Sequence, residues 1–185
     1  MSAGYDGDIK IYVKKSSSDI SEFDRLIKNI DFNKSNGNKE KAENLGAFFA
    51  KLKPTDEALN IDVPKSELTS AVLYQARVLI TFLCGRITRN EVRDQFLSDT
   101  VRSSMYDFLK ENEEGYYKNI ADGAAFSFYR VALKKIGEPE EITGKEFAKL
   151  CGNPKNENLI SLGRRIYLNT VDYARALIDT CEFQY

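Results

Sequence analysis

The 185 residues contain no histidine, the side chain that most often serves as an acid or base near neutral pH. A Ser-His-Asp triad, a Cys-His pair and a zinc site with histidine ligands are therefore excluded. An enzyme built from this sequence would have to use Asp, Glu, Tyr and Arg, with a divalent metal as an option.

Polar side chains interrupt three strongly apolar helical segments. They are Gln75 and Arg77 in the first segment, Asp122 and Arg130 in the second, and Asp172 and Arg175 in the third. Burying any of them alone would be costly, so we expect them to form interhelical ion pairs or to reach solvent. The alternative is a pocket in which Asp122 and Asp172 act as acid and base, or hold a cation, close to Arg175.

Tyrosine and arginine gather in one segment, at Tyr116, Tyr117, Tyr129 and Arg130. These two residue types most often anchor contacts between proteins. Adjacent helical residues point about 100° apart, so both rings of the Tyr116–Tyr117 doublet are buried only if two sides of the helix are covered. The pattern predicts a protein-binding surface, and ordinary core packing is the alternative.

The three cysteines, Cys84, Cys151 and Cys181, lie far apart in the sequence. Their spacing is that of neither a metal site nor a redox pair, and an odd number leaves one unpaired. We expect free thiols buried in the core of a protein of the reducing cytoplasm.

The 27 basic and 28 acidic residues are mixed evenly, with a formal net charge of −1. The segment from Thr88 to Lys110 has the outline of a helix-turn-helix, but its charges balance, whereas a protein that binds duplex DNA is basic. Nucleic acid is therefore disfavoured as a partner. Glycine-rich phosphate loops, Cys-x-x-Cys and calcium-loop patterns are missing from the sequence, so no cofactor is expected.

The sequence predicts no membrane segment. The first thirty residues lack the apolar core of a secretory signal. The longest apolar run, 71–84, is 14 residues long and contains Gln75 and Arg77, whereas a bilayer span needs about 20 residues.

Apolar residues that recur every three or four positions predict a string of helices. The expected ranges are 20–30, 40–52, 65–84, 89–97, a helix capped at 98 or 99 that ends near 110, 116–136, 143–151 and 154–181, with a loop at 33–41. Their expected boundaries include Gly85, two Thr-x-x-Glu capping boxes at Thr88 and Thr143, Gly137 and Asn153. The helix at 65–84 is apolar on most sides and is expected at the centre.

These elements predict an all-α fold, an irregular bundle of about six to eight helices, of which two or three are long. Residues 1–18 are expected to form an N-terminal arm, flexible or strand-like, with the strand at 8–15. Residues 19–185 are expected to form a single helical domain without internal repeats.

The leading functional hypothesis is a non-enzymatic helical module that binds another protein or a second copy of itself. It would act as a regulator, inhibitor, adaptor or immunity-type factor through its aromatic and arginine surface. A histidine-free enzyme is the first alternative, and a helical nucleic-acid-binding regulator is the second.

Overall fold

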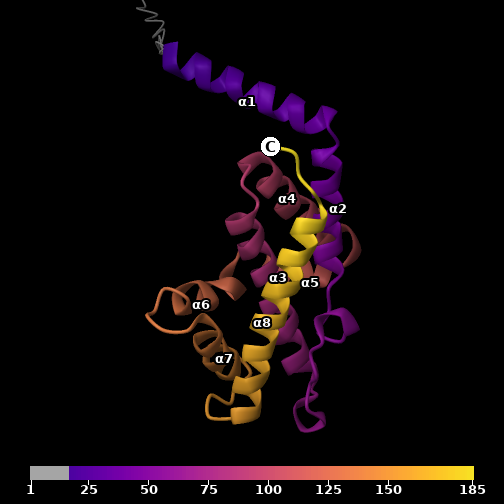
Figure 1. Ribbon diagram of the computed structural model, residues 1–185. Helices are drawn as coiled ribbons and strands as arrows, with labels where there is room; N and C mark the ends of the chain where they lie inside the picture. Colours follow the sequence, from indigo (N-terminus) through magenta and orange to yellow (C-terminus); the bar gives the residue numbers. More distant parts are fainter. Residues whose placement is uncertain (1–16) are drawn as a thin grey trace, which may run out of the picture.

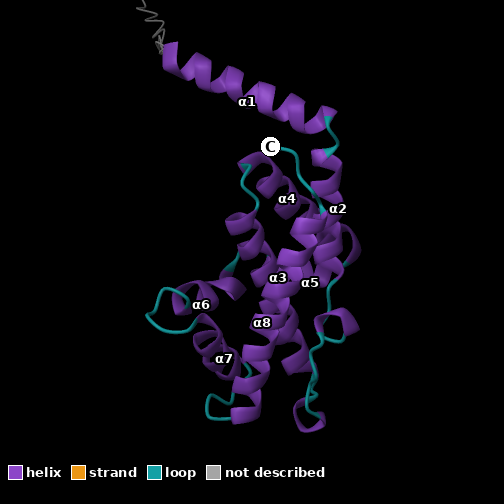
Figure 2. Cartoon of the chain, in the orientation of Figure 1, coloured by secondary structure: helices purple, strands orange, loops and turns teal. Residues whose placement is uncertain are grey.

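The computed structural model describes residues 17–185, and this range contains eight α-helices and no strand (Figures 1 and 2). The prediction of an all-α, irregular multi-helix bundle is confirmed. The strand expected at 8–15 lies outside the described residues. The helices are α1 (Ser17–Ser35), α2 (Asn38–Lys51), α3 (Ser70–Glu91), α4 (Gln95–Asn112), α5 (Glu114–Ile120), α6 (Ala124–Ala132), α7 (Pro139–Leu150) and α8 (Glu157–Thr180).

Helix α3 is the central helix, as its apolar circumference predicts. Every residue from Val78 to Cys84 is buried, and α3 contacts α4, α6, α7 and α8. By length and composition it is also the one helix of the described range that could cross a membrane, and 61% of its apolar window is buried inside the protein. Such burial is typical of a core helix that neighbouring helices cover on all sides.

The expected boundary at Gly85 is wrong, because α3 continues through it to Glu91. The Thr88 hydroxyl donates to the carbonyl of Cys84 at 2.8 Å, inside the helix, instead of capping a new one. A glycine inside a helix costs only about 1 kcal/mol, which packing of the core can outweigh. The start is also later than expected: residues 65–67 form a 3-10 turn, and Thr69 caps α3.

Asp94, rather than Ser98 or Asp99, caps α4. Its Oδ1 accepts the backbone N–H of Leu97 at 2.9 Å. Its Oδ2 accepts the side-chain amide of Asn29, in α1, at 2.7 Å. One carboxylate therefore holds the first turn of α4 and also binds the outlying helix α1.

Helix α1 extends across one end of the bundle (Figure 1). It is longer than the expected 20–30, and the loop expected at 33–41 shrinks to a short turn in which Gly37 adopts a left-handed φ of 80°. The apolar side chains of Leu26, Ile27 and Phe32 are 42–50% exposed. Much of the apolar side of α1 is therefore uncovered in this chain.

The helix expected at 116–136 is broken into α5 and α6. Gly123 adopts a φ of 72°, a left-handed conformation that glycine reaches without strain. The Asp122 side chain accepts the backbone N–H of Ala124 at 2.8 Å and so holds the first turn of α6. The turn redirects the chain, so that α5 contacts α4 and α6 contacts α3.

Two further helix starts differ from the expected ones. Helix α7 begins at Pro139, because proline fits the first helical turn, and Thr143 is buried inside the helix instead of capping it. Helix α8 is capped by Asn156, whose side chain accepts the backbone N–H of Leu159 at 3.2 Å, and not by Asn153. Helix α7 therefore starts without a side-chain cap, whereas α8 is capped three residues later than expected.

Helices α7 and α8 approach closely through two glycines. A Cβ at Gly163 would lie 2.7 Å from the Cβ of Phe147 and 2.9 Å from the Cα of Gly144. A Cβ at Gly144 would lie 2.5 Å from the carbonyl oxygen of Ile160. Only residues without a side chain allow this separation, so the two glycines set the distance between the helices.

Gly163→Ala should therefore destabilise the fold. The added methyl group has no space, and overpacking costs about 1–3 kcal/mol of unfolding free energy, which urea denaturation can measure. Gly115→Ala is the matched control, because a Cβ there meets no atom within 4 Å, and replacing glycine in a helix is expected to stabilise by about 0.5–1 kcal/mol. Equal effects of the two substitutions would contradict the close helix contact.

Candidate functional site

The four residues of the predicted protein-binding surface differ in burial and in surroundings. Tyr129 is 0% exposed, and its ring stacks on Phe82 with a centroid distance of 5.6 Å. It is a core residue, which is the alternative that the sequence left open for it. The hydroxyl of Tyr116 lies 2.9 Å from that of Thr81. Tyr117 is partly exposed and Arg130 is exposed, and these two line the pockets described below.

Asp122, Asp172 and Arg175, the residues considered for an acidic pocket of an enzyme, do not line any of the pockets described below. Asp122 is exposed and holds the first turn of α6. Asp172 is exposed on α8, and Arg175 pairs with Glu91 of α3 at 3.0 Å. Across residues 17–185, no group of three or more Cys, Asp or Glu side chains is placed to hold a metal ion.

Cys84 is buried as expected, whereas Cys151 and Cys181 are only partly buried. Burial raises the pKa of the Cys84 thiol to about 12 and that of Cys151 to about 11. Burial also raises the pKa of Cys181. All three are free, and since the thiolate is the nucleophile, a protonated thiol does not serve in catalysis at neutral pH.

Four arginines from three helices line one small pocket. Arg86 and Arg89 come from α3, Arg102 from α4 and Arg130 from α6, and the space between them is about 150 Å³. We call it the arginine pocket. Its other lining residues include Asn90, Tyr106, Phe82 and Phe126, and the lining contains no carboxylate. The pocket is therefore strongly cationic in a chain whose net charge is −1.

Few anions neutralise these guanidinium groups. Arg102 pairs with Asp99 at 3.3 Å. For Arg86, Arg89 and Arg130, the described part of the chain offers no carboxylate within 4.0 Å. Like charges repel one another, and a bound anion would reduce this repulsion.

Tyr106 forms part of the same pocket. Burial raises the pKa of its phenol, while the positive charges of Arg102 and Arg130 act in the opposite direction. Both guanidinium groups are therefore near enough to the Tyr106 ring to influence its hydroxyl. A protonated phenol at neutral pH supplies a neutral hydrogen-bond donor among four cations.

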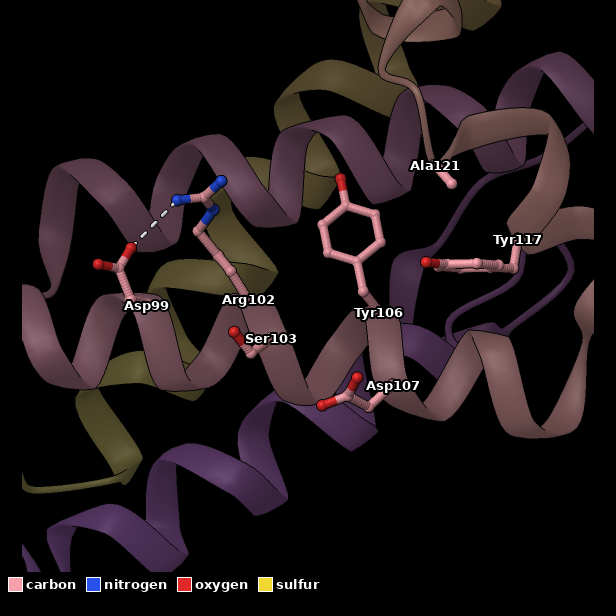
Figure 3. A pocket seen from close by; sticks show the side chains of 7 residues that line it. All are labelled: Asp99, Arg102, Ser103, Tyr106, Asp107, Tyr117 and Ala121. Carbon is pink, nitrogen blue, oxygen red and sulfur yellow. Dashed lines mark hydrogen bonds and ion pairs between the residues drawn. The ribbon is translucent and has the colours of Figure 1, made fainter. Parts of the chain in front are cut away.

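A second, more open pocket adjoins the first and has a volume of about 500 Å³. Figure 3 shows Arg102 and Tyr106 pointing from α4 in the same direction, while the hydroxyl end of Tyr117, from α5, points toward Tyr106. Asp99, which pairs with Arg102, and Asp107 also line this pocket. Arg102 and Tyr106 line both pockets, so the two form one continuous surface. We call this surface the arginine–tyrosine face; it consists of Arg86, Arg89, Arg102, Tyr106, Tyr117 and Arg130.

A third pocket lies elsewhere, beside Arg77 and Tyr116, with a volume of about 570 Å³ and an apolar lining that includes Leu73 and Tyr74. Arg77 lies over the Tyr116 ring, 4.2 Å from its centroid, and donates to both carboxylate oxygens of Glu113, one of them at 2.6 Å. The hydrogen bond from Arg77 lowers the pKa of Glu113, although burial acts in the opposite direction. This ion pair explains how Arg77, one of the polar residues that interrupt the apolar helix α3, is accommodated.

Comparison with family models, curated proteins and solved structures finds no match to this chain.

The arginine pocket was not predicted from the sequence. Its signal is Arg86 and Arg89, three residues apart on one side of a helix, followed by Arg102 and Arg130. The net charge of the 88–110 segment concealed it, because this count averages Arg89 and Arg102 with the carboxylates of the segment and leaves Arg130 out.

Glu113→Gln should weaken the fold in a pH-dependent way. The pKa of Glu113 is below its ordinary 4.5 in the folded state, so the stability contributed by its charge is present above that pH and is lost as the pH falls further. We expect the substitution to cost about 1–3 kcal/mol of unfolding free energy at neutral pH. Urea denaturation should show this difference shrinking below about pH 4.

Glu114→Gln is the control for that measurement, because its pair with Lys118 is exposed, with 69% and 68% of the two side chains accessible. An exposed pair contributes about 0–1 kcal/mol. A Glu113→Gln variant that matched this control at neutral pH would show that the Arg77 pair does not stabilise the fold.

Proposed function

We propose that this protein is a non-enzymatic, cytoplasmic helical module that binds an acidic segment of another protein through its arginine–tyrosine face. The observation that carries the proposal is the gathering of four guanidinium groups, three of them without a carboxylate partner in the described chain, beside two partly exposed tyrosines. Free thiols support the cytoplasmic location.

The residue types of the face support a protein contact. Arginine and tyrosine are enriched among the residues that contribute most to binding between proteins. They come from α3, α4, α5 and α6, so packed helices hold them in place. A cationic surface also attracts an acidic partner during association and raises the association rate.

Charge distribution favours an acidic polypeptide over a nucleic acid. The four arginines gather around one pocket of about 150 Å³, whereas a nucleic-acid backbone carries closely spaced phosphates along its length. Asp99 and Asp107 line the adjoining pocket and would repel the next phosphates. An acidic polypeptide segment can instead place a single anionic group in the arginine pocket and polar or basic residues beside these carboxylates.

Site-specific photo-crosslinking in the native cell tests the proposal. A photoreactive phenylalanine derivative in place of Ser103, which lines the open pocket, should cross-link to another polypeptide. The same group at Lys155, exposed between α7 and α8, is the positional control and should not. Adding Arg102→Gln and Arg130→Gln should reduce the cross-link by about tenfold or more, the loss expected for residues at the centre of an interface.

Arg164→Gln is the charge-matched control, because Arg164 pairs with Glu141 and does not line either pocket of the face. It should leave the cross-link unchanged. Equal cross-linking from positions 103 and 155, or cross-linking that persists without Arg102 and Arg130, would overturn the proposal. A product of twice the mass of this chain would overturn it in favour of self-association.

A further inference from the structure

The charge of the arginine pocket identifies the kind of anion it can hold. Arginine stays protonated at all physiological pH values, so the pocket carries four positive charges. Asp99 offsets one of them at Arg102. A carboxylate would neutralise one more, whereas a phosphate monoester carries about −1.5 to −2 charges at neutral pH. The excess of positive charge therefore favours a phosphate group over a carboxylate.

The volume of the pocket limits the size of the anion that it can hold. Its volume of about 150 Å³ is much smaller than the volume of about 500 Å³ of the adjoining pocket. This space accommodates one phosphate group with little solvent.

The donors of the pocket suit a tetrahedral dianion. A guanidinium group presents its N–H groups as a planar fork that binds phosphate oxygens in pairs. Arg86, Arg89, Arg102 and Arg130 line the pocket from three helices, so they approach the space from different directions. Tyr106 lines the same space with a phenol that remains protonated at neutral pH.

The apolar residues of the pocket strengthen these contacts. Phe82 and Phe126 are 7% and 3% exposed, and they line the pocket with their rings 5.8 Å apart. They keep water from one side of the site. Arg86, Arg89 and Arg130 are exposed, so these rings exclude water only from the inner wall of the site, and ionic hydrogen bonds are stronger where water is partly excluded.

From these observations we infer that the arginine pocket binds a single phosphate monoester, carried by a phosphorylated side chain of the partner protein. This inference rests on the proposed function, because it takes the phosphate group to belong to the acidic segment of the partner protein. The adjoining pocket of about 500 Å³ leaves room for the residues that flank the phosphorylated position.

Calorimetric titration of the full chain with inorganic phosphate, and with a serine-phosphorylated peptide of neutral sequence, tests the pocket. Both should bind saturably at constant ionic strength, the phosphopeptide more tightly, and the unphosphorylated peptide should not bind. Arg89→Gln and Arg130→Gln should each weaken binding by about tenfold or more, the loss of one charge-assisted hydrogen bond. Arg164→Gln, which removes the same charge elsewhere, should not.

Asp99→Asn should change the affinity for phosphate in the opposite direction to the arginine substitutions. It frees Arg102 from its carboxylate partner and removes a negative charge next to the pocket. The variant should therefore bind phosphate more tightly than the native chain. Circular dichroism of each variant shows whether it is folded, and a variant that gains affinity cannot be explained by unfolding.

Three results would overturn the inference. They are phosphate giving no more heat than chloride at matched ionic strength, Arg89→Gln and Arg130→Gln binding as the native chain does, and inorganic phosphate binding as tightly as the phosphopeptide.

Phosphatase treatment before cross-linking distinguishes failure of this inference from failure of the proposed function. A cross-link from position 103 that survives the treatment but requires Arg102 and Arg130 supports the proposed function and contradicts the inference. Saturable phosphopeptide binding without any cross-link supports the phosphate chemistry of the pocket and contradicts the proposed function.

Discussion

The fold depends on the need to cover helix α3 on all sides. Its residues from Val78 to Cys84 are buried without interruption, so no single neighbouring helix can cover them. Helices α4, α6, α7 and α8 all contact it. After Cys84 the same helix keeps Ile87 and Thr88 buried but exposes Arg86 and Arg89 on another side. The helices that cover the core therefore also bring Arg102, from α4, and Arg130, from α6, beside these two arginines.

Most helices follow from hydrophobic periodicity, whereas several boundaries do not. The apolar stretch before Gly85 identifies α3 as the central helix, but nothing local shows that the helix runs through that glycine. Gly123 has the opposite outcome, since it ends the helical run that the sequence predicts to be continuous. A glycine permits both a left-handed turn and a helical interior, and the surrounding packing decides between them.

The candidate site was predictable only in part. Arg130 was identified and lines the arginine pocket, and Tyr117 lines the pocket beside it. Tyr129 is buried instead, because the break at Gly123 redirects α6 so that this ring packs on Phe82. The arginines of α3 and α4 come together only through tertiary packing. A charge count along the sequence cannot reveal them, because it does not separate the sides of a helix.

Asp94 connects helix α1 with the first turn of helix α4. This carboxylate caps α4 and also accepts the hydrogen bond from Asn29 of α1. Helix α1, with its uncovered leucine, isoleucine and phenylalanine side chains, is thus joined through one residue to the helix that carries Arg102 and Tyr106. An event that displaced α1 would alter the hydrogen bonding at the first turn of α4, about two helical turns before Arg102.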